Sequence, residues 1–554
     1  MTEPAKILVV ALDACDPTTI RELAAAGEVP TLARLLETSA SATTHNPYGL
    51  FVGSLWSSFF TARTAARTGF HCWEEVDTKT YERRLTSPLE IRGTPFWETL
   101  SDAGKRVAVL DVPHSRADKP INGVMVSEYA CHDRHFGFHT SPPELAKEIE
   151  AEFGLTPILT AEPDLVRDWA PDDYLHREGP HRTPDEERAL THGLVAGIGQ
   201  KTQVSTKLLA EGDWDLFLSV YGESHSIGHQ QWHLHDPGHR DHDVALAAEL
   251  DPIRAVYRGL DEAIGEHLAL AGPDTTVFVL LSHGMGSRYE GSHLLHEILR
   301  LLDTVETEGL RGGGAMTTAK RAYSALPRPL RTKLASAAMP LLRKRLASAP
   351  LPAVPNWATA EQRSKQRFYL SPNNFVFGGV RINLAGREPH GVVQPGAEYE
   401  AVCEQLTEDL LSLVNVASGK PVVREVSRTS DHYDREADDT LPDLLIDWAR
   451  TGPIETVWSP KTGVVYGPDE HWRTGDHRPD GLLLASGPGF EPGAKLPALD
   501  VVDLGSTLSA MLGVELTDDV DGRPLPLGET SVVSVMKGPF RTENVLNGPF
   551  MTCA

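Results

Sequence analysis

The chain has 554 residues, of which 52 are Lys or Arg and 77 are Asp or Glu, so its formal net charge is −25. A charge this negative repels phosphate backbones, which argues against a polymeric nucleic acid as partner. With 40% hydrophobic and 23% charged residues, the composition is that of a globular protein and excludes an intrinsically disordered chain.

The cysteines and the apolar segments indicate in which cellular compartment the protein is expected. The five cysteines are widely spaced and form no Cys-x-x-Cys pair, which argues against a disulfide framework and against a thiolate zinc site. The apolar run Ile7–Leu12 is too short for a signal peptide, and no stretch reaches the roughly 20 apolar residues of a membrane helix. We therefore expect a cytoplasmic protein that contacts no membrane.

Short β-branched apolar runs alternate along the chain with amphipathic stretches, a pattern typical of an α/β domain with a mostly parallel sheet. We expect a helix to begin after Asp16, which can cap it, with Pro17 in its first turn. The predicted strands, in chain order, are Ile7–Leu12, Val107–Leu110, Leu216–Val220, Val277–Leu281, Leu444–Ile446 and Leu482–Leu484. Polar groups that follow such strands meet at the carboxyl edge of the sheet, where ligands bind in open α/β folds.

Two segments break this alternation and predict insertions. Residues 130–200 are rich in His, Pro and acidic residues. A second segment contains a basic run from Arg311 to Pro350, with nine basic residues and no acidic one. This run can be a pair of solvated basic helices or a lid over an anionic substrate. The expected organisation is a core of residues 1–303 and 363–530, a basic cap insertion of residues 304–362, and a tail of residues 531–554.

The stretch after the strand Leu216–Val220 carries the strongest local signal for chemistry. His225 and His229 lie four residues apart, so on a helix their imidazoles share one face and can bind a single cation. The alternative is a chance pairing on a helix surface. His283, followed by a glycine, comes directly after the strand Val277–Leu281. It is placed either to bind a metal or to be a hydrogen-bonded core histidine.

Asp13 and His477 also lie beside strand ends. Asp13 closes the first predicted strand, where a buried carboxylate without a function would be costly. His477 lies in the polar stretch Gly475–Gly481, which leads into the strand Leu482–Leu484. Groups from four distant parts of the chain are therefore candidates for one site.

The order of these motifs resembles the type I phosphodiesterase/nucleotide pyrophosphatase family of the alkaline phosphatase superfamily. The resemblance covers nearly the full chain. The motifs that carry it are Ile7–Asp13, Leu55–Thr61, Glu223–Trp232, Ser282–Met285, Gly386–Pro389 with Pro395–Gly396, and His477–Gly481. It implies a three-layer α/β/α core of the alkaline phosphatase type, with a mostly parallel central sheet and inserted cap segments.

The resemblance also implies a metal site. In that family two divalent metals, usually zinc, hold a phosphoryl group between an attacking and a leaving oxygen. Carried over to this sequence, Asp13 and His283 would hold one metal. The other metal would be held by His225, His229 and His477.

Two substitutions change these sites. His225 stands where the family usually carries Asp, which produces the three-histidine set known from catalytic zinc. Ser282 stands where the family carries the carboxylate that precedes its histidine, so the Asp13/His283 site has lost a ligand. We therefore expect one firmly bound Zn²⁺, whereas the second metal would bind weakly or not at all.

A third departure concerns the nucleophile. The family places its attacking hydroxyl four residues before a Trp, and counting back from Trp56 gives Val52. Ser54 is the candidate nucleophile if the backbone shifts at Gly53, and otherwise it caps the following helix. With Ser54 the reaction has two steps and a covalent intermediate, whereas without it an activated water attacks directly.

The resemblance thus implies a metal-dependent phosphoester hydrolase of the phosphodiesterase or nucleotide pyrophosphatase type, acting on a small phosphorylated or sulfated molecule. Two alternatives remain open. One is a transferase of the same superfamily that moves a phosphoryl or sulfuryl group, since the residues at 225 and 282 make the site less negative. The other is a catalytically inactive binding protein, which Val52 favours and the clustered histidines oppose.

Overall fold

The computed structural model describes eight segments of the chain. They are residues 6–130, 135–157, 183–307, 326–348, 358–436, 439–469, 473–516 and 519–526. The expected tail at 531–554 lies outside the described residues, as do the first three basic residues of the Arg311–Pro350 run.

A nine-stranded, mostly parallel sheet forms the centre of the described structure. Its order is β20-β2-β19-β9-β1-β8-β5-β6-β7, with β19 and β7 antiparallel to their neighbours. Five of the six predicted strands are confirmed here, as β1, β5, β8, β9 and β19. The bounds are β1 (Lys6–Leu12), β2 (Ala40–His45), β5 (Val107–Leu110), β6 (Gly123–Ser127), β7 (His139–Ser141), β8 (Leu216–Tyr221), β9 (Thr275–Leu281), β19 (Asp480–Ser486) and β20 (Leu499–Asp500).

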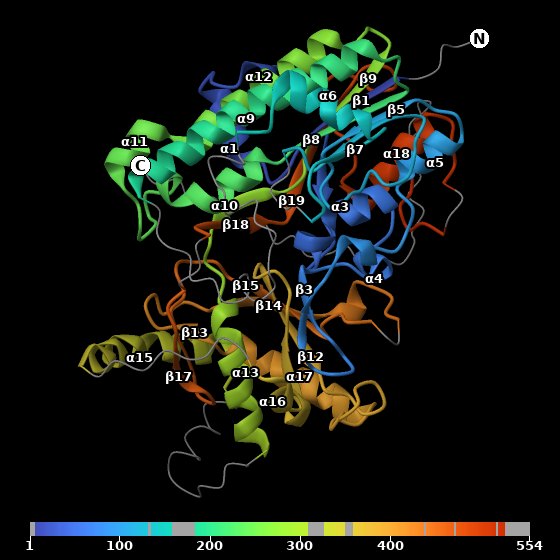
Figure 1. Cartoon of the computed structure of the whole chain (residues 1–554). Helices are drawn as coiled ribbons and strands as arrows, with labels where there is room; N and C mark the ends of the chain where they lie inside the picture. The colour runs from blue at the N-terminus through green and yellow to red at the C-terminus, as the bar shows by residue number, and fades with distance from the viewer. Residues whose placement is uncertain are drawn as a thin grey trace, which may run out of the picture.

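The structure consists of a larger and a smaller unit, and the nine-stranded sheet belongs to the larger one (Figure 1). Helices cover both faces of this sheet, so the larger unit has the expected three-layer α/β/α fold. Alternation along β1 produces the two faces, because Leu8 and Val10 pack into one hydrophobic core and Ile7 and Val9 pack into the other. The first face carries α1 (Pro17–Ala25), α2 (Pro30–Thr38), α6 (Glu144–Phe153), α9 (Pro184–Glu211), α10 (Glu223–His235) and α12 (Pro252–Leu270). The second carries α3 (Phe51–Thr61), α5 (Phe96–Asp102) and α18 (Val502–Met511). The short helices α4 (Ala65–Thr68) and α11 (Val244–Leu250) follow α3 and α10.

The starts of α1 and α9 follow from local sequence. Asp16 caps α1 as predicted, because its carboxylate accepts a hydrogen bond from the Thr19 amide at 2.7 Å, and Pro17 lies in the first turn. Residues 184–200, which we expected within an inserted segment, belong to α9, which Thr183 caps and which packs against α12.

A second, smaller unit is built from antiparallel strands (Figure 1). Its sheets have the orders β11-β12-β15-β14 and β13-β16-β17, and apolar residues of α13 and α17 pack on the first of them. The predicted strand Leu444–Ile446 is confirmed as β15, but it pairs with β12 and β14 here instead of joining the large sheet. The strands are β11 (Phe368–Ser371), β12 (Phe377–Ile382), β13 (Val414–Asn415), β14 (Val423–Arg428), β15 (Leu444–Trp448), β16 (Thr456–Ser459) and β17 (Gly463–Tyr466). The helices are α13 (Ser292–Thr307), α15 (Arg328–Ser348), α16 (Ala360–Lys365) and α17 (Ala397–Leu411). A separate hairpin consists of β3 (Glu74–Val76) and β4 (Arg83–Leu85).

Within the expected basic insertion at residues 304–362, the structure describes the end of α13, the helix α15 and the start of α16. The helix α15 contains the described part of the basic run. Met339 of α15 packs against Val414 and Val416 of the smaller unit. Leu341 points to solvent and is 77% exposed. None of the helices in the described segments is long and apolar enough to cross a membrane.

Candidate metal centre

The site lies at the carboxyl edge of three neighbouring strands of the large sheet. Asp13 follows β1, α10 begins two residues after β8, and Ser282 and His283 follow β9. Backbone hydrogen bonds continue past the strand ends, since the Asp13 amide donates to the Tyr221 carbonyl (2.8 Å) and the Ser282 amide to the Leu12 carbonyl (3.0 Å). These groups are therefore held in register at the edge where open α/β sheets bind ligands.

His477 reaches this edge on a two-stranded ribbon. The ribbon consists of β10 (Gly284–Ser287), which follows His283, and β18 (Gly475–Arg478), and it places Met285 opposite His477. His283 and His477 are 194 residues apart in sequence, yet His283 Nε2 lies 2.6 Å from His477 Nδ1.

Two glycines let α10 approach the ribbon of β10 and β18 closely. A Cβ at Gly475 would lie 2.2 Å from the Gly228 carbonyl oxygen and 2.7 Å from Cβ of Trp232, so no larger residue fits there without a backbone shift. A Cβ at Gly228 would in turn meet the Met285 side chain at 2.7 Å. This approach brings Nδ1 of His229 to 2.8 Å from the Gly475 carbonyl oxygen.

His225, His229 and His477 form the centre of the site. Their ligand atoms lie within 4.8 Å of one another, and their ring centroids are 4.5 to 4.7 Å apart. The three residues are buried, with exposed fractions of 8%, 2% and 1%. Among the residues that the structure describes, they form the one group of His, Cys and carboxylate side chains with the geometry to hold a metal ion.

Hydrogen bonds at the far nitrogens orient the two imidazoles of α10. When His229 Nδ1–H donates to the Gly475 carbonyl, the neutral ring presents an unprotonated Nε2, which faces His477 Nε2 at 3.0 Å. His225 Nδ1 lies 2.8 Å from Asp13 Oδ2, and donation to that carboxylate frees Nε2 in the same way. A carbonyl or carboxylate behind each imidazole is typical of metal-binding histidines.

A chain of hydrogen bonds orients His477 and ends on the same carboxylate. It runs from His477 Nδ1 to His283 Nε2 (2.6 Å), from His283 Nδ1 to Ser282 Oγ (2.9 Å), and from Ser282 Oγ to Asp13 Oδ1 (3.2 Å). A carboxylate only accepts, so each group donates toward Asp13 and His477 keeps an unprotonated Nε2. All three imidazoles thereby present the lone pair that a metal requires.

Burial keeps the His477 ring neutral. Desolvation, followed by the neighbouring imidazoles of His283, His229 and His225, holds the pKa of His477 well below its usual value. Arg473 lowers this pKa further. A neutral imidazole is the form that binds a metal.

Ser54, the predicted nucleophile, lies inside α3. Its hydroxyl is completely buried and donates to the Leu50 carbonyl at 2.8 Å, within the helix. Phe51, the first residue of α3, faces the site, and its ring centroid lies 5.6 Å from that of His283. Of the other five predicted site residues, Asp13, His225, His283 and His477 are joined by hydrogen bonds, in part through Ser282. His229 lies beside them, with its Nε2 3.0 Å from Nε2 of His477.

Three contributions were missed by the sequence reasoning. Trp56, which served to locate the expected nucleophile, donates its indole N–H to Asp13 Oδ1 at 3.0 Å. Ser282, interpreted as a lost ligand, connects Asp13 to His283. Arg473 places a guanidinium nitrogen 3.4 Å from His229 Nε2. Its position four residues before His477 was the available signal, but spacing alone does not reveal a side-chain contact.

Comparison with known proteins identifies the family. A family model described as type I phosphodiesterase / nucleotide pyrophosphatase matches residues 7–480, whereas no curated protein matches the sequence significantly. Among solved structures, phosphonoacetate hydrolase from Sinorhizobium meliloti, in complex with phosphonoacetate, is 13% identical with a TM-score of 0.50, covering 92% of this chain and 96% of that chain. Murine ectonucleotide pyrophosphatase / phosphodiesterase 5 is 11% identical with a TM-score of 0.45, covering 92% and 95%. Because the family model spans most of the sequence, the chain belongs to the type I phosphodiesterase/nucleotide pyrophosphatase family of phosphoester hydrolases.

Proposed function

We propose that this protein is a zinc-dependent phosphoester hydrolase that uses a single metal ion and acts on a small phosphorylated molecule. The observation that carries the proposal is the set of three buried imidazoles, His225, His229 and His477, each oriented through its other nitrogen. Family membership supplies the phosphoester chemistry. The net charge of −25 favours a small substrate over a nucleic acid polymer.

The donor set fits zinc. Three neutral imidazoles with an open fourth position are the ligand set of several catalytic zinc sites. A Zn²⁺ ion held by these residues would act as a Lewis acid toward a phosphoryl oxygen and would make water more acidic. The burial of all three rings limits access of bulk water, which strengthens electrostatic interactions at the site.

The hydrogen bonds favour one metal over the two that the family resemblance implies. A second metal would need Asp13 and His283, and these residues are engaged in the bonds that orient His225 and His477. Ser282 offers a hydroxyl where a further carboxylate ligand would be required. We therefore infer that Asp13, Ser282 and His283 are positioning residues that act through the three metal-binding imidazoles.

We also infer that water, and not Ser54, attacks the phosphoryl group, because the Ser54 hydroxyl is buried and bonded within α3. Ser54→Ala should lower the free energy of unfolding by about 1 kcal/mol through the lost hydrogen bond, and should leave kcat/KM unchanged. Chemical denaturation and steady-state kinetics with bis(4-nitrophenyl) phosphate check both values. A folded Ser54→Ala protein without turnover, together with a phosphorylated intermediate trapped in the wild type, would instead identify Ser54 as the nucleophile.

The direct test of the proposed function is the metal content. The purified protein should contain one zinc ion per chain by plasma mass spectrometry. Dialysis against a chelator should remove the zinc and the turnover of bis(4-nitrophenyl) phosphate together, and one equivalent of Zn²⁺ should restore both. Full turnover by the zinc-free protein contradicts the proposal.

A further inference from the structure

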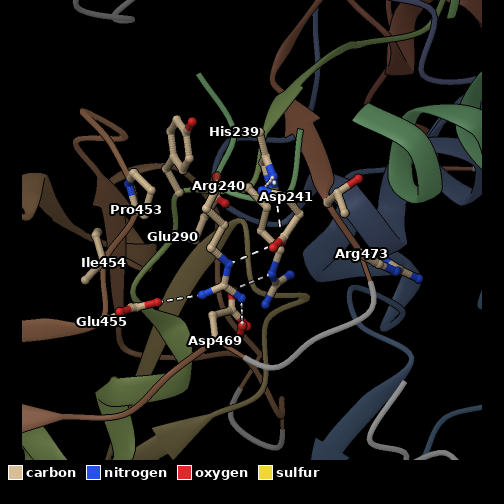
Figure 2. Close-up of a pocket in the computed structure, with 12 residues that line it drawn as sticks. His239, Arg240, Asp241, Glu290, Pro453, Ile454, Glu455, Asp469 and Arg473 are labelled. Atoms are coloured by element: carbon tan, nitrogen blue, oxygen red, sulfur yellow. Dashed lines mark hydrogen bonds and ion pairs between the residues drawn. The ribbon is translucent and has the colours of Figure 1, made fainter. Parts of the chain in front are cut away.

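A pocket adjoins the three-histidine centre at the junction of the two units. It lies between the loop after α10, the end of β10 and the segments that flank β16 and β17. Its lining includes Arg240, Glu290, Glu455, Asp469, Arg473 and Thr474. Figure 2 shows Arg473 at the edge of this group, with its guanidinium extending away from Arg240 and Glu455.

Two other arginines of the pocket are held by carboxylates. Arg240 contacts Glu455 at 2.5 Å, which ties the loop after α10 to the smaller unit. Arg288 contacts Asp469 and Asp476, each at 2.9 Å. These ion pairs hold the walls of the pocket together, so their arginines have a structural role.

Arg473 also reaches the metal centre, because its NH1 lies 3.4 Å from His229 Nε2 and can donate a hydrogen bond to that nitrogen. That nitrogen is one of the three that would hold the metal. A metal ion bound to that nitrogen would replace the guanidinium there, and the two positive charges would then repel each other. The repulsion becomes an attraction when an anion lies between them and accepts from the guanidinium while its other oxygens face the metal.

We propose that Arg473 binds the phosphoryl group of the substrate beside the metal, an inference that rests on the proposed function. The guanidinium presents several N–H donors in a planar fork that matches the oxygens of a phosphoryl group. The same donors stabilise the charge on those oxygens as the ester bond breaks. The ligand class is therefore a tetrahedral oxyanion held jointly by the metal and Arg473, with the rest of the ester toward the pocket.

The test measures metal binding and anion binding separately. Cobalt(II), followed by its visible absorption, reports on the three imidazoles, and calorimetry of inorganic phosphate with the zinc-loaded protein reports on the anion site. Arg473→Ala should raise the Kd for phosphate by about 10-fold to 100-fold, the loss expected for a charged hydrogen bond. Its Kd for cobalt should stay the same or fall, since a nearby positive charge is removed. Arg473→Lys should recover part of the phosphate affinity, and Arg254→Ala on α12, which removes an exposed arginine paired with Glu28, is the matched control.

Results that contradict the proposed function differ from results that contradict only the role of Arg473. A wild-type protein that binds neither cobalt nor zinc contradicts the proposed function itself. A zinc-loaded Arg473→Ala protein with a phosphate Kd within about twofold of wild type overturns only the role of Arg473. Loss of cobalt binding in Arg473→Ala also overturns it, because the arginine would then support the geometry of the imidazoles and not the anion.

Discussion

Replacement of His229 by alanine should remove the bound zinc and lower kcat/KM by on the order of 10³-fold or more, because a catalytic metal contributes several kcal/mol of transition-state stabilisation. His229 lies between the Gly475 carbonyl and the Nε2 of His477, so its loss removes one of three proposed ligands. Zinc content and turnover of bis(4-nitrophenyl) phosphate, measured on the same preparation, check the prediction.

A matched control is available on the same helix. His235 is the last residue of α10, and its ring packs edge-on against Trp232 with centroids 4.9 Å apart. His235→Ala should keep one zinc ion and wild-type turnover. Thermal unfolding followed by circular dichroism shows whether both variants are folded. A folded His229→Ala protein that retains zinc and activity would exclude the three-histidine centre.

The central sheet could be predicted because its strands are short apolar runs at intervals that fit a parallel α/β fold. The strands β1, β8 and β9 are buried on both faces. Because they face apolar layers on both sides, their sequences are almost continuously apolar, and this made them recognisable. The run at Leu444–Ile446 has the same composition, yet it is β15 of the smaller unit. Apolar content indicates a buried strand but does not say which sheet it joins, because the pairing depends on distant segments.

The sequence was sufficient to predict most of the residues that form the candidate site, but not which hydrogen bonds join them. The spacing of His225 and His229 follows from helix periodicity, and the structure places both on α10. The bond from Asp13 to His225 joins residues 212 positions apart, and the contact between His229 and the Gly475 carbonyl joins residues 246 positions apart. Such contacts are set by how α10 packs against the end of β1 and against β18, which the sequence pattern of none of these segments specifies.

Replacement of Ser282 by aspartate should raise the zinc content from one ion to two per chain. The new carboxylate would lie beside His283 and Asp13, at the position where the family resemblance implies a carboxylate ligand. Unlike the serine hydroxyl, it cannot donate to Asp13, so two carboxylates would face each other in a buried site. A second cation relieves that repulsion. Zinc should therefore raise the Tm of Ser282→Asp by more than it raises the Tm of the wild type.

Two further substitutions separate the effect of charge from that of hydrogen bonding. Ser282→Asn adds similar volume without charge and should keep one zinc ion. Ser282→Ala breaks the chain that fixes His477 and should weaken zinc binding by about 10-fold to 100-fold, with the stoichiometry still at one. One zinc ion in Ser282→Asp, with wild-type affinity in Ser282→Ala, would show that this chain does not limit metal binding. The predicted pattern would mean that the number of metals depends on whether residue 282 carries a carboxylate, whereas the hydrogen bond from residue 282 to Asp13 sets only the affinity for the single zinc ion.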